Sequence, residues 1–222
     1  MRSGKNFHIS DDDRDGLCQT LCTGGVRGGS SAAARLMSQG LSIHNLYFDV
    51  LKPVAERFDD FWNEDRVTFL EVHVAMVRLE QIVKEYACPK PTIDGLPKRQ
   101  AFFATVPGDE HTAGLRMAAN IQRSKGWQIR LITHLSHAKL LSEIEHSPTT
   151  ILGLSIGSKN SMHQLYNLVR SVRVSRPDVR ILVSGSLVAV DEHPIRLLGV
   201  DASAKSFEEA EQMLDDLVEQ TT

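Results

Sequence analysis

The sequence has no long apolar run, few cysteines and little excess charge, and each absence narrows the class of protein. No uninterrupted apolar stretch approaches the roughly 20 residues of a membrane span, so we expect no membrane-spanning segment. Residues 1–6 lack the apolar stretch of a signal peptide, which leads us to expect a cytoplasmic protein. A net charge of −3 argues against a chain whose bulk binds nucleic acid or membranes electrostatically.

Three cysteines, an odd number, argue against a disulfide framework. Cys18 and Cys22 are four residues apart, so they would share one face of a helix. We interpret them as small buried or half-exposed thiols, with a redox or metal-binding role as the alternative. A length of 222 residues, 41% of them hydrophobic, suits one compact domain with a smaller partner.

The amino-terminal part divides into segments of different composition. Residues 1–35 are polar and rich in glycine, which predicts a flexible arm. Residues 36–88 carry apolar side chains at helical spacing and predict a small helical bundle, with a kink at Pro53. Residues 89–98 contain prolines and a glycine that block any regular element, so they predict a linker between two domains.

From residue 99 to residue 222 the pattern alternates between strands and helices. Strands are predicted at 101–106, 128–133, 150–156, 179–184 and 200–204, and helices at 114–124, 136–145, 162–174, 193–198 and 207–219. Five such units predict an α/β fold, a Rossmann-like (flavodoxin-like) five-stranded parallel sheet with helices on both faces. Ligands of such sheets bind beyond the carboxyl ends of the strands.

A short polar loop follows the first predicted strand. His111 lies five residues after Val106 and can offer a neutral imidazole nitrogen to a metal. Asp109 can accept a hydrogen bond from the other ring nitrogen, which would orient the ring. Gly114 allows a bulky group to approach the backbone. Taken alone, the pattern Asp-x-His-x-x-Gly also fits an exposed loop with a helix-capping Asp or Thr.

Further histidines and several basic residues lie close to this loop in the sequence. His134 and His137 follow the second predicted strand, where they either rim the same pocket or serve as loop and helix-cap residues. The basic residues around the first helix of the sheet domain are by default a solvated face. They are Arg116, Arg123, Lys125 and Arg130.

With Ser155 and Gly185 at the ends of the third and fourth strands, the loop resembles the signature of the cobalamin-binding domain family. The resemblance covers residues 99–220 and implies a cobalamin, a cobalt corrinoid, as cofactor. It implies that His111 binds cobalt from below, that Ser155 hydrogen-bonds the benzimidazole of the displaced tail, and that Gly185 leaves room for that tail. Ser186 stands where the family has a second glycine. Further expected cofactor contacts are Asp109, Glu110, Thr112, Gly114, Leu154, Gly157 and Ser184.

Residues 62–73 resemble the helical cap of the B12-dependent photoreceptors. The resemblance implies that Trp62 covers the upper face of the corrin and that His73 is a possible upper ligand of cobalt. Val72 stands in place of the family's Glu, and Glu71 comes one residue early. The residues by themselves also allow a core position for Trp62 and a bundle role for His73.

The loop 111–116 and the helical segment 71–80 look like those of the AerR/PpaA-type antirepressors of photosynthetic bacteria. This resemblance implies a light-responsive transcriptional regulator rather than an enzyme. Its partner would be a PpsR/CrtJ-type repressor of photosynthesis genes, with DNA touched only indirectly or weakly. Two alternatives remain: a corrinoid carrier protein of a methyltransferase system, whose loop usually reads His-Asp-Ile-Gly-Lys-Asn, and a haem-binding redox sensor on the same scaffold.

Overall fold

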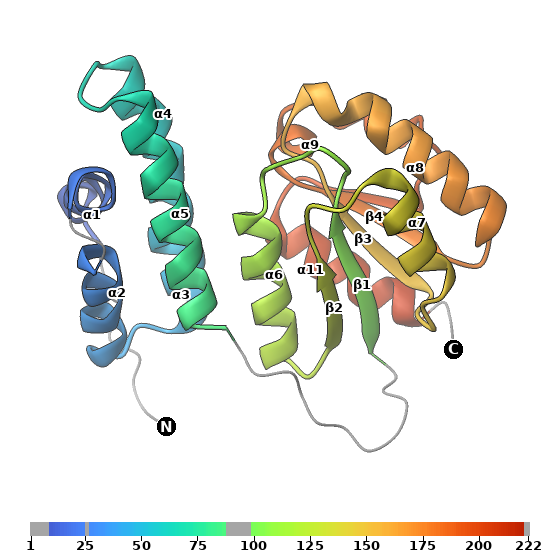
Figure 1. Ribbon diagram of the computed structural model, residues 1–222. Helices are drawn as coiled ribbons and strands as arrows, with labels where there is room; N and C mark the ends of the chain where they lie inside the picture. Colours follow the sequence, from blue (N-terminus) through green and yellow to red (C-terminus); the bar gives the residue numbers. More distant parts are fainter. Residues whose placement is uncertain (1–8, 25–26, 88–98, 220–222) are drawn as a thin grey trace. The chain divides into compact units, whose positions relative to one another are not determined.

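The computed structural model describes residues 9–24, 27–87 and 99–219, and the chain forms two compact units, 1–87 and 88–222 (Figure 1). The predicted linker at 89–98 lies outside the described residues. Among the helices that the structure describes, none has the length and apolar character needed to cross a bilayer.

The first unit is helical throughout its described length. Its elements are α1 (Asp11–Thr23), α2 (Gly28–Ser38), the short α3 (Ile43–Asn45), the π-helical η1 (Leu46–Leu51), α4 (Lys52–Asn63) and α5 (Phe69–Glu85). The prediction of a flexible arm over residues 1–35 is therefore wrong for the part that the structure describes, because α1 and α2 are packed helices. Residues 1–8 and 25–26 lie outside the described residues.

Local signals explain why α1 and α2 form despite their glycines. Ser10 and Asp13 make a capping box, in which each backbone N–H donates to the other residue's side chain at 3.1 Å. The buried side chain of Leu21 then faces Gly29 of α2, where a Cβ would lie 2.4 Å from Leu21 Cδ2. Gly29, one of the glycines on which the prediction of a flexible arm rested, thus allows α1 and α2 to pack closely.

Cys18 and Cys22 lie on the buried face of α1, and neither forms a disulfide. Burial, followed by the neighbouring Cys22, raises the pKa of the Cys18 thiol to about 12, and burial also raises the pKa of Cys22. Protonated thiols are poor nucleophiles and poor metal ligands. The structure supports the interpretation of both as buried packing residues.

A π-helical turn, η1, directly precedes α4 and Pro53, the residue at which the sequence predicted a kink. Pro53 has no backbone N–H, so the Asp49 carbonyl lacks its usual α-helical donor. Arg14 of α1 supplies one, since its Nε donates to Asp49 O at 3.1 Å. Just before the proline, the Lys52 N–H donates to Tyr47 O, five residues back. The irregular turn is therefore stabilised by a contact from another helix.

The second unit is a five-stranded parallel sheet in the order β2-β1-β3-β4-β5, which confirms the predicted α/β fold. The strands are β1 (Gln100–Thr105), β2 (Gln128–Ile132), β3 (Ile151–Ser155), β4 (Arg180–Ser184) and β5 (Ala202–Ala204). The helices are α6 (Ala113–Ser124), α7 (His137–Glu145), η2 (Lys159–Ser161), α8 (Met162–Ser175), α9 (Ser186–Val190), α10 (His193–Arg196) and α11 (Phe207–Glu219). The short α9 was not predicted.

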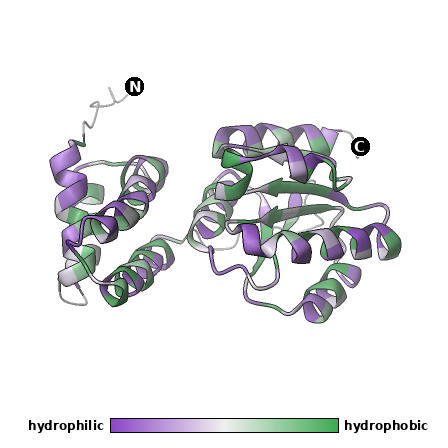
Figure 2. Cartoon of the chain, turned by 90° about the horizontal axis from the view of Figure 1, so that it is seen from above, coloured by the Kyte–Doolittle hydropathy of each residue, from purple (hydrophilic) through white to green (hydrophobic). Residues whose placement is uncertain are grey.

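Both faces of the sheet are covered by helices. Side chains of α6 and α11 pack on one face, and those of α7 and α8 pack on the other. Figure 2 shows the strands as the most continuously hydrophobic part of this unit, as expected for strands buried on both faces. The chain passes from β1 outward to β2 and then returns to β3 on the other side of β1. Ligands of such sheets bind at this switch point, between the ends of β1 and β3.

Candidate cobalamin site

Asp109 joins the two loops that meet at the switch point. Its carboxylate is buried, and Oδ1 accepts the His111 backbone N–H at 3.0 Å and lies 2.8 Å from His111 Nδ1. On the other side, Oδ2 accepts the backbone N–H groups of Gly157 at 2.9 Å and Ser158 at 3.0 Å. The loop after β1 is thereby fixed to the loop after β3.

These hydrogen bonds decide the charge of Asp109. Burial raises the pKa of the carboxyl, but the hydrogen bonds from His111, Gly157 and Ser158 outweigh it and hold the pKa well below its usual range. An ionised Asp109 at neutral pH requires the hydrogen of His111 to sit on Nδ1. A metal would then be bound through Nε2, as in other histidine sites with a carboxylate behind the ring.

The imidazole of His111 also rests against Gly157. A Cβ at residue 157 would lie 2.3 Å from His111 Cγ, so any larger residue there would displace the ring. The His111 side chain is nevertheless 61% exposed. It is held from behind by Asp109 and from one side by Gly157, and it remains accessible to a large planar cofactor.

Gly114 lies in the first turn of α6, and unlike Gly157 it is not required by a contact within the protein. A Cβ at this position would meet no protein atom within 4 Å. Glycine inside a helix is unfavourable compared with alanine, and the fold itself does not require it here. The space beside Gly114 fits a bound group that lies close to the start of α6.

The predicted tail site lies at the ends of β3 and β4. Ser155 is buried and pairs with Ser184 on β4, and among the described residues its hydroxyl makes no hydrogen bond. A buried hydroxyl in this position can donate to a nitrogen of a bound base. Leu154 belongs to the core on the α7–α8 face, and its contact with the cofactor, like that of Ser184, stays a prediction.

Gly185 follows β4 directly and precedes Ser186, the first residue of α9. Gly185 has φ +123°, and a Cβ there would lie 2.2 Å from Ile156 O, so the fold requires glycine whether or not a tail binds. Ser186 Oγ donates to Gly157 O at 3.3 Å. The serine that replaces the family's second glycine therefore holds the loop against which His111 packs.

The remaining loop residues lie at the rim. Thr112 is buried at the N-cap position of α6, whereas the Glu110 side chain is 81% exposed and lies 3.4 Å from His134 Nδ1. His137 instead contacts Ser171 of α8 at 3.2 Å, so it is a packing residue and not part of the rim. Gly157 was expected to contact the cofactor, but the hydrogen bonds from the Gly157 and Ser158 amides to Asp109 were not predicted; their only signal was their position directly after β3.

The basic residues around α6 do not form a free cationic face. Arg116 donates to Thr133 Oγ1, Arg123 to the Ile129 carbonyl, Lys125 pairs with Glu211, and Arg130 pairs with Glu143. Each of these side chains thus makes a hydrogen bond or an ion pair within the second unit.

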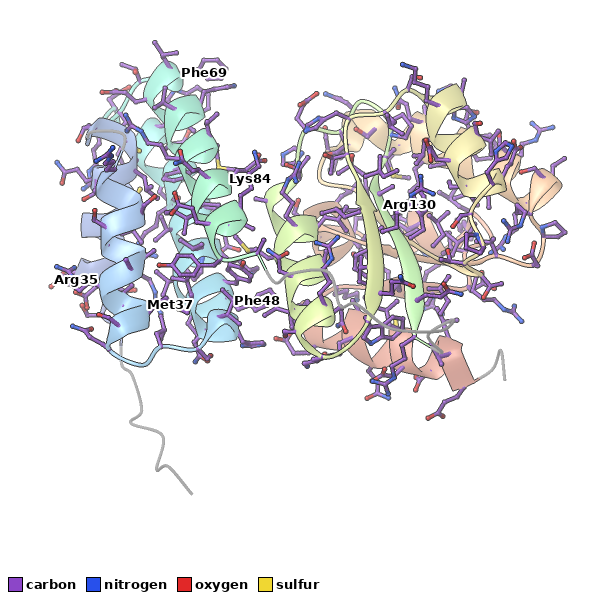
Figure 3. All side chains as sticks on the ribbon, turned by 60° about the horizontal axis from the view of Figure 1, so that its bottom comes forward. Arg35, Met37, Phe48, Phe69, Lys84 and Arg130 are labelled. Carbon is purple, nitrogen blue, oxygen red and sulfur yellow. The ribbon has the colours of Figure 1, made fainter. Side chains whose placement is uncertain are left out.

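Within the helical unit, Trp62 and Phe69 are exposed and lie near each other. The Trp62 residue is 49% exposed, which excludes the alternative that it is a core residue. Its ring centroid lies 6.3 Å from that of Phe69, and Phe69 in turn lies 4.1 Å from the His73 ring. Figure 3 shows Phe69 projecting from the beginning of α5. Leu70 and Val77, 71% and 68% exposed, extend the surface along the helix.

We call this surface the aromatic patch; it consists of Trp62, Phe69, Leu70, His73 and Val77. His73 Nδ1 lies 3.0 Å from the Phe69 carbonyl, which can only accept, so the hydrogen sits on Nδ1 and Nε2 is the acceptor. Glu71 does not replace the family's Glu: it forms a capping box with Thr68, whose hydrogen bonds lower its pKa.

The described residues fit a corrin. A corrin supplies most of the cobalt ligands itself, so the protein would need to supply only one, and the exposed His111 could supply it through Nε2. Among the residues that the structure describes, no group of three or more His, Cys, Asp or Glu could by itself hold a metal ion.

Comparisons with known proteins show the family to which the chain belongs. A model of the B12 binding domain matches residues 99–218, more than half of the chain. The chain therefore belongs to the B12-binding domain family, and its cofactor is a cobalamin. No curated protein matches the sequence.

Solved structures resemble the chain in fold. The monomethylamine corrinoid protein of Methanosarcina barkeri is 17% identical, with a TM-score of 0.75 over 94% of this chain and 100% of that one. A chain of the methanol:cobalamin methyltransferase complex of the same organism is 15% identical, with a TM-score of 0.51 over 97% of this chain and 83% of that one.

Proposed function

We propose that this chain is a cobalamin-dependent transcriptional regulator in which the helical unit covers the upper face of the corrin. The observation that carries the proposal is the aromatic patch. Large apolar side chains gathered on one solvent-facing surface are typical of a binding surface. Trp62 offers a flat indole that suits a planar macrocycle, and His73, which contacts the neighbouring Phe69, offers Nε2 as an acceptor.

The chain's own residues then act on the two sides of the cofactor. Bound cobalamin supplies a cobalt–carbon bond that light can cleave when an alkyl group is the upper ligand. Asp109 keeps His111 in the tautomer that binds cobalt through Nε2. The aromatic patch packs differently against a corrin with and without the upper group. The difference in packing free energy would shift the population of the helical unit from one conformation to another when the upper group is lost.

The partner that we propose is a PpsR/CrtJ-type repressor, with DNA affected only through that partner. The support is the resemblance of loop 111–116 and of segment 71–80 to the AerR/PpaA-type antirepressors. The test is to load the protein with adenosylcobalamin in the dark, and to record its absorption spectrum and its affinity for the repressor before and after illumination. We expect both to change; an unchanged spectrum together with unchanged affinity would contradict the proposal.

A corrinoid carrier of a methyltransferase system is the second candidate. The similarity to solved corrinoid proteins spans both units and supports a carrier more directly than it supports a regulator, although at 17% identity it concerns the fold. Against it, Thr112 and Ala113 stand where carriers usually have Asp and Ile. Methyl transfer from the methylated protein to a partner methyltransferase, with no effect of light on repressor binding, would establish the carrier. Neither candidate requires the chain to act as an enzyme by itself.

A further inference from the structure

We propose that Glu110 and His134 form a polar clamp on the rim of the site and bind a peripheral amide side chain of the corrin. The inference rests on cobalamin binding at His111 and not on the regulatory role. A primary amide offers both N–H donors and a carbonyl acceptor. A carboxylate accepts from the first and an imidazole N–H donates to the second, so this pair of side chains recognises an amide from two sides.

The placement of the two residues supports the clamp. Glu110 directly precedes His111 in the loop after β1, and His134 lies in the loop after β2, the neighbouring parallel strand. Both residues therefore lie at the same edge of the sheet as His111, where the parallel strands β1 and β2 end. Glu110 Oε2 lies 3.4 Å from His134 Nδ1, and the two side chains are 81% and 47% exposed. Both retain the capacity to bind a further group.

The backbone of His134 gives the second observation. Its φ of +61° is in the left-handed region, which costs free energy for a residue with a side chain. Two contacts hold it there: the buried Thr105 Oγ1 accepts the His134 N–H at 3.4 Å, and Arg116 Nη2 donates to Thr133 Oγ1 at 3.0 Å. Unfavourable conformations that the surroundings enforce are concentrated at functional sites. Here the enforced conformation places an imidazole at the rim.

The test uses cobinamide, which keeps the corrin amides and lacks the nucleotide tail. We expect Glu110→Ala and His134→Ala each to weaken binding of both cobinamide and cobalamin by about 3- to 10-fold, the effect of one hydrogen bond. Ser155→Ala, on the tail side, should weaken cobalamin binding and leave cobinamide binding unchanged. His137→Ala is the matched control, because this histidine contacts Ser171 and not the rim. The measurement is a spectrophotometric titration of the full-length apoprotein.

A second variant separates binding from folding. His134→Gly removes the side chain and relieves the left-handed conformation, so we expect the melting temperature of the apoprotein to be maintained or raised while cobinamide affinity falls. Wild-type affinity in Glu110→Ala and His134→Ala would overturn the clamp, as would a His134→Gly variant that loses stability but no affinity. Cobalamin binding by all of these variants would leave His111 and the regulatory proposal intact, so the two failures are distinguishable.

Discussion

At the scale of single residues, the site depends on one buried carboxylate that orients one imidazole. Asp109 gains four hydrogen bonds from the loops after β1 and β3, and these keep it ionised despite its burial. The negative charge behind His111 makes the ring a better metal ligand and fixes Nε2 as the donor atom. The fold thus fixes the orientation and the tautomer of the His111 ring without the cofactor.

Asp109→Asn should weaken cobalamin binding by about 10- to 100-fold, because the amide cannot hold the Nδ1 hydrogen as a carboxylate does. Spectrophotometric titration of the apoprotein measures the effect. Asp201→Asn is the matched control: the Asp201 side chain is only 17% exposed and its pKa is also lowered, but it accepts from Arg173, Arg180 and the Ile181 N–H at the opposite edge of the sheet. It should lose stability and keep its affinity. Equal affinity losses in both variants would count against the role given to Asp109.

The lowered pKa of Asp109 also predicts a pH dependence of stability. A group whose pKa is depressed in the folded state stabilises the fold above its unfolded pKa, about 4 for Asp, and loses that contribution as the pH falls further. The free energy of unfolding of the wild type should therefore fall more steeply below about pH 4 than that of Asp109→Asn. Urea unfolding at several pH values tests this, and parallel curves for the two proteins would contradict it.

The residue-level part of the site was only partly predictable from the sequence. The types and spacing of Asp109, His111 and Gly114 are local, so they could be recognised in the sequence. The Gly157 and Ser158 amides lie almost 50 residues away and come into place only through the sheet topology. Nothing local to His134 revealed its left-handed backbone, which depends on Thr105 and Arg116.

At the scale of elements, the strands were predictable, whereas α1 and the beginning of α2 were not. Buried β-strands between polar helices follow a simple apolar pattern, which the structure confirms. The glycine content around residues 24–29 suggested an arm, yet Gly29 makes room for Leu21 of α1. The capping pair Ser10–Asp13 was a local helix signal that composition alone concealed.

The start of α6 provides an element-scale prediction. Gly114→Ala should stabilise the apoprotein by up to about 1 kcal/mol, because alanine favours a helix and meets no protein atom. The same methyl group should weaken cobalamin binding, because it fills space that the cofactor needs. Thermal unfolding and titration measure the two effects. The comparison variant is Gly185→Ala, which we expect to destabilise the fold strongly because of its φ of +123°. A Gly114→Ala variant with unchanged affinity would show that the space has no role.

At the scale of the whole molecule, the chain combines a B12-binding unit with a helical unit that carries the exposed aromatic patch. If the patch covers the corrin, then Trp62→Ala should weaken cobalamin binding about 10-fold, equivalent to the burial of roughly 50 Å² of apolar surface. Leu197→Ala is the control, since Leu197 is also exposed, at 73%, but directly follows α10 in the second unit. Equal affinity of Trp62→Ala and wild type would remove the patch from the cofactor site.

The central claim is that His111 binds cobalt in place of the cofactor's own benzimidazole. Electron paramagnetic resonance of the reduced cobalt(II) protein tests it directly, because a nitrogen ligand splits each cobalt line. In protein grown with histidine labelled with the spin-half isotope of nitrogen, the account predicts that each triplet becomes a doublet, and that His111→Ala loses the splitting from the protein. Triplets that persist unchanged in the labelled protein would show that the benzimidazole remains on cobalt.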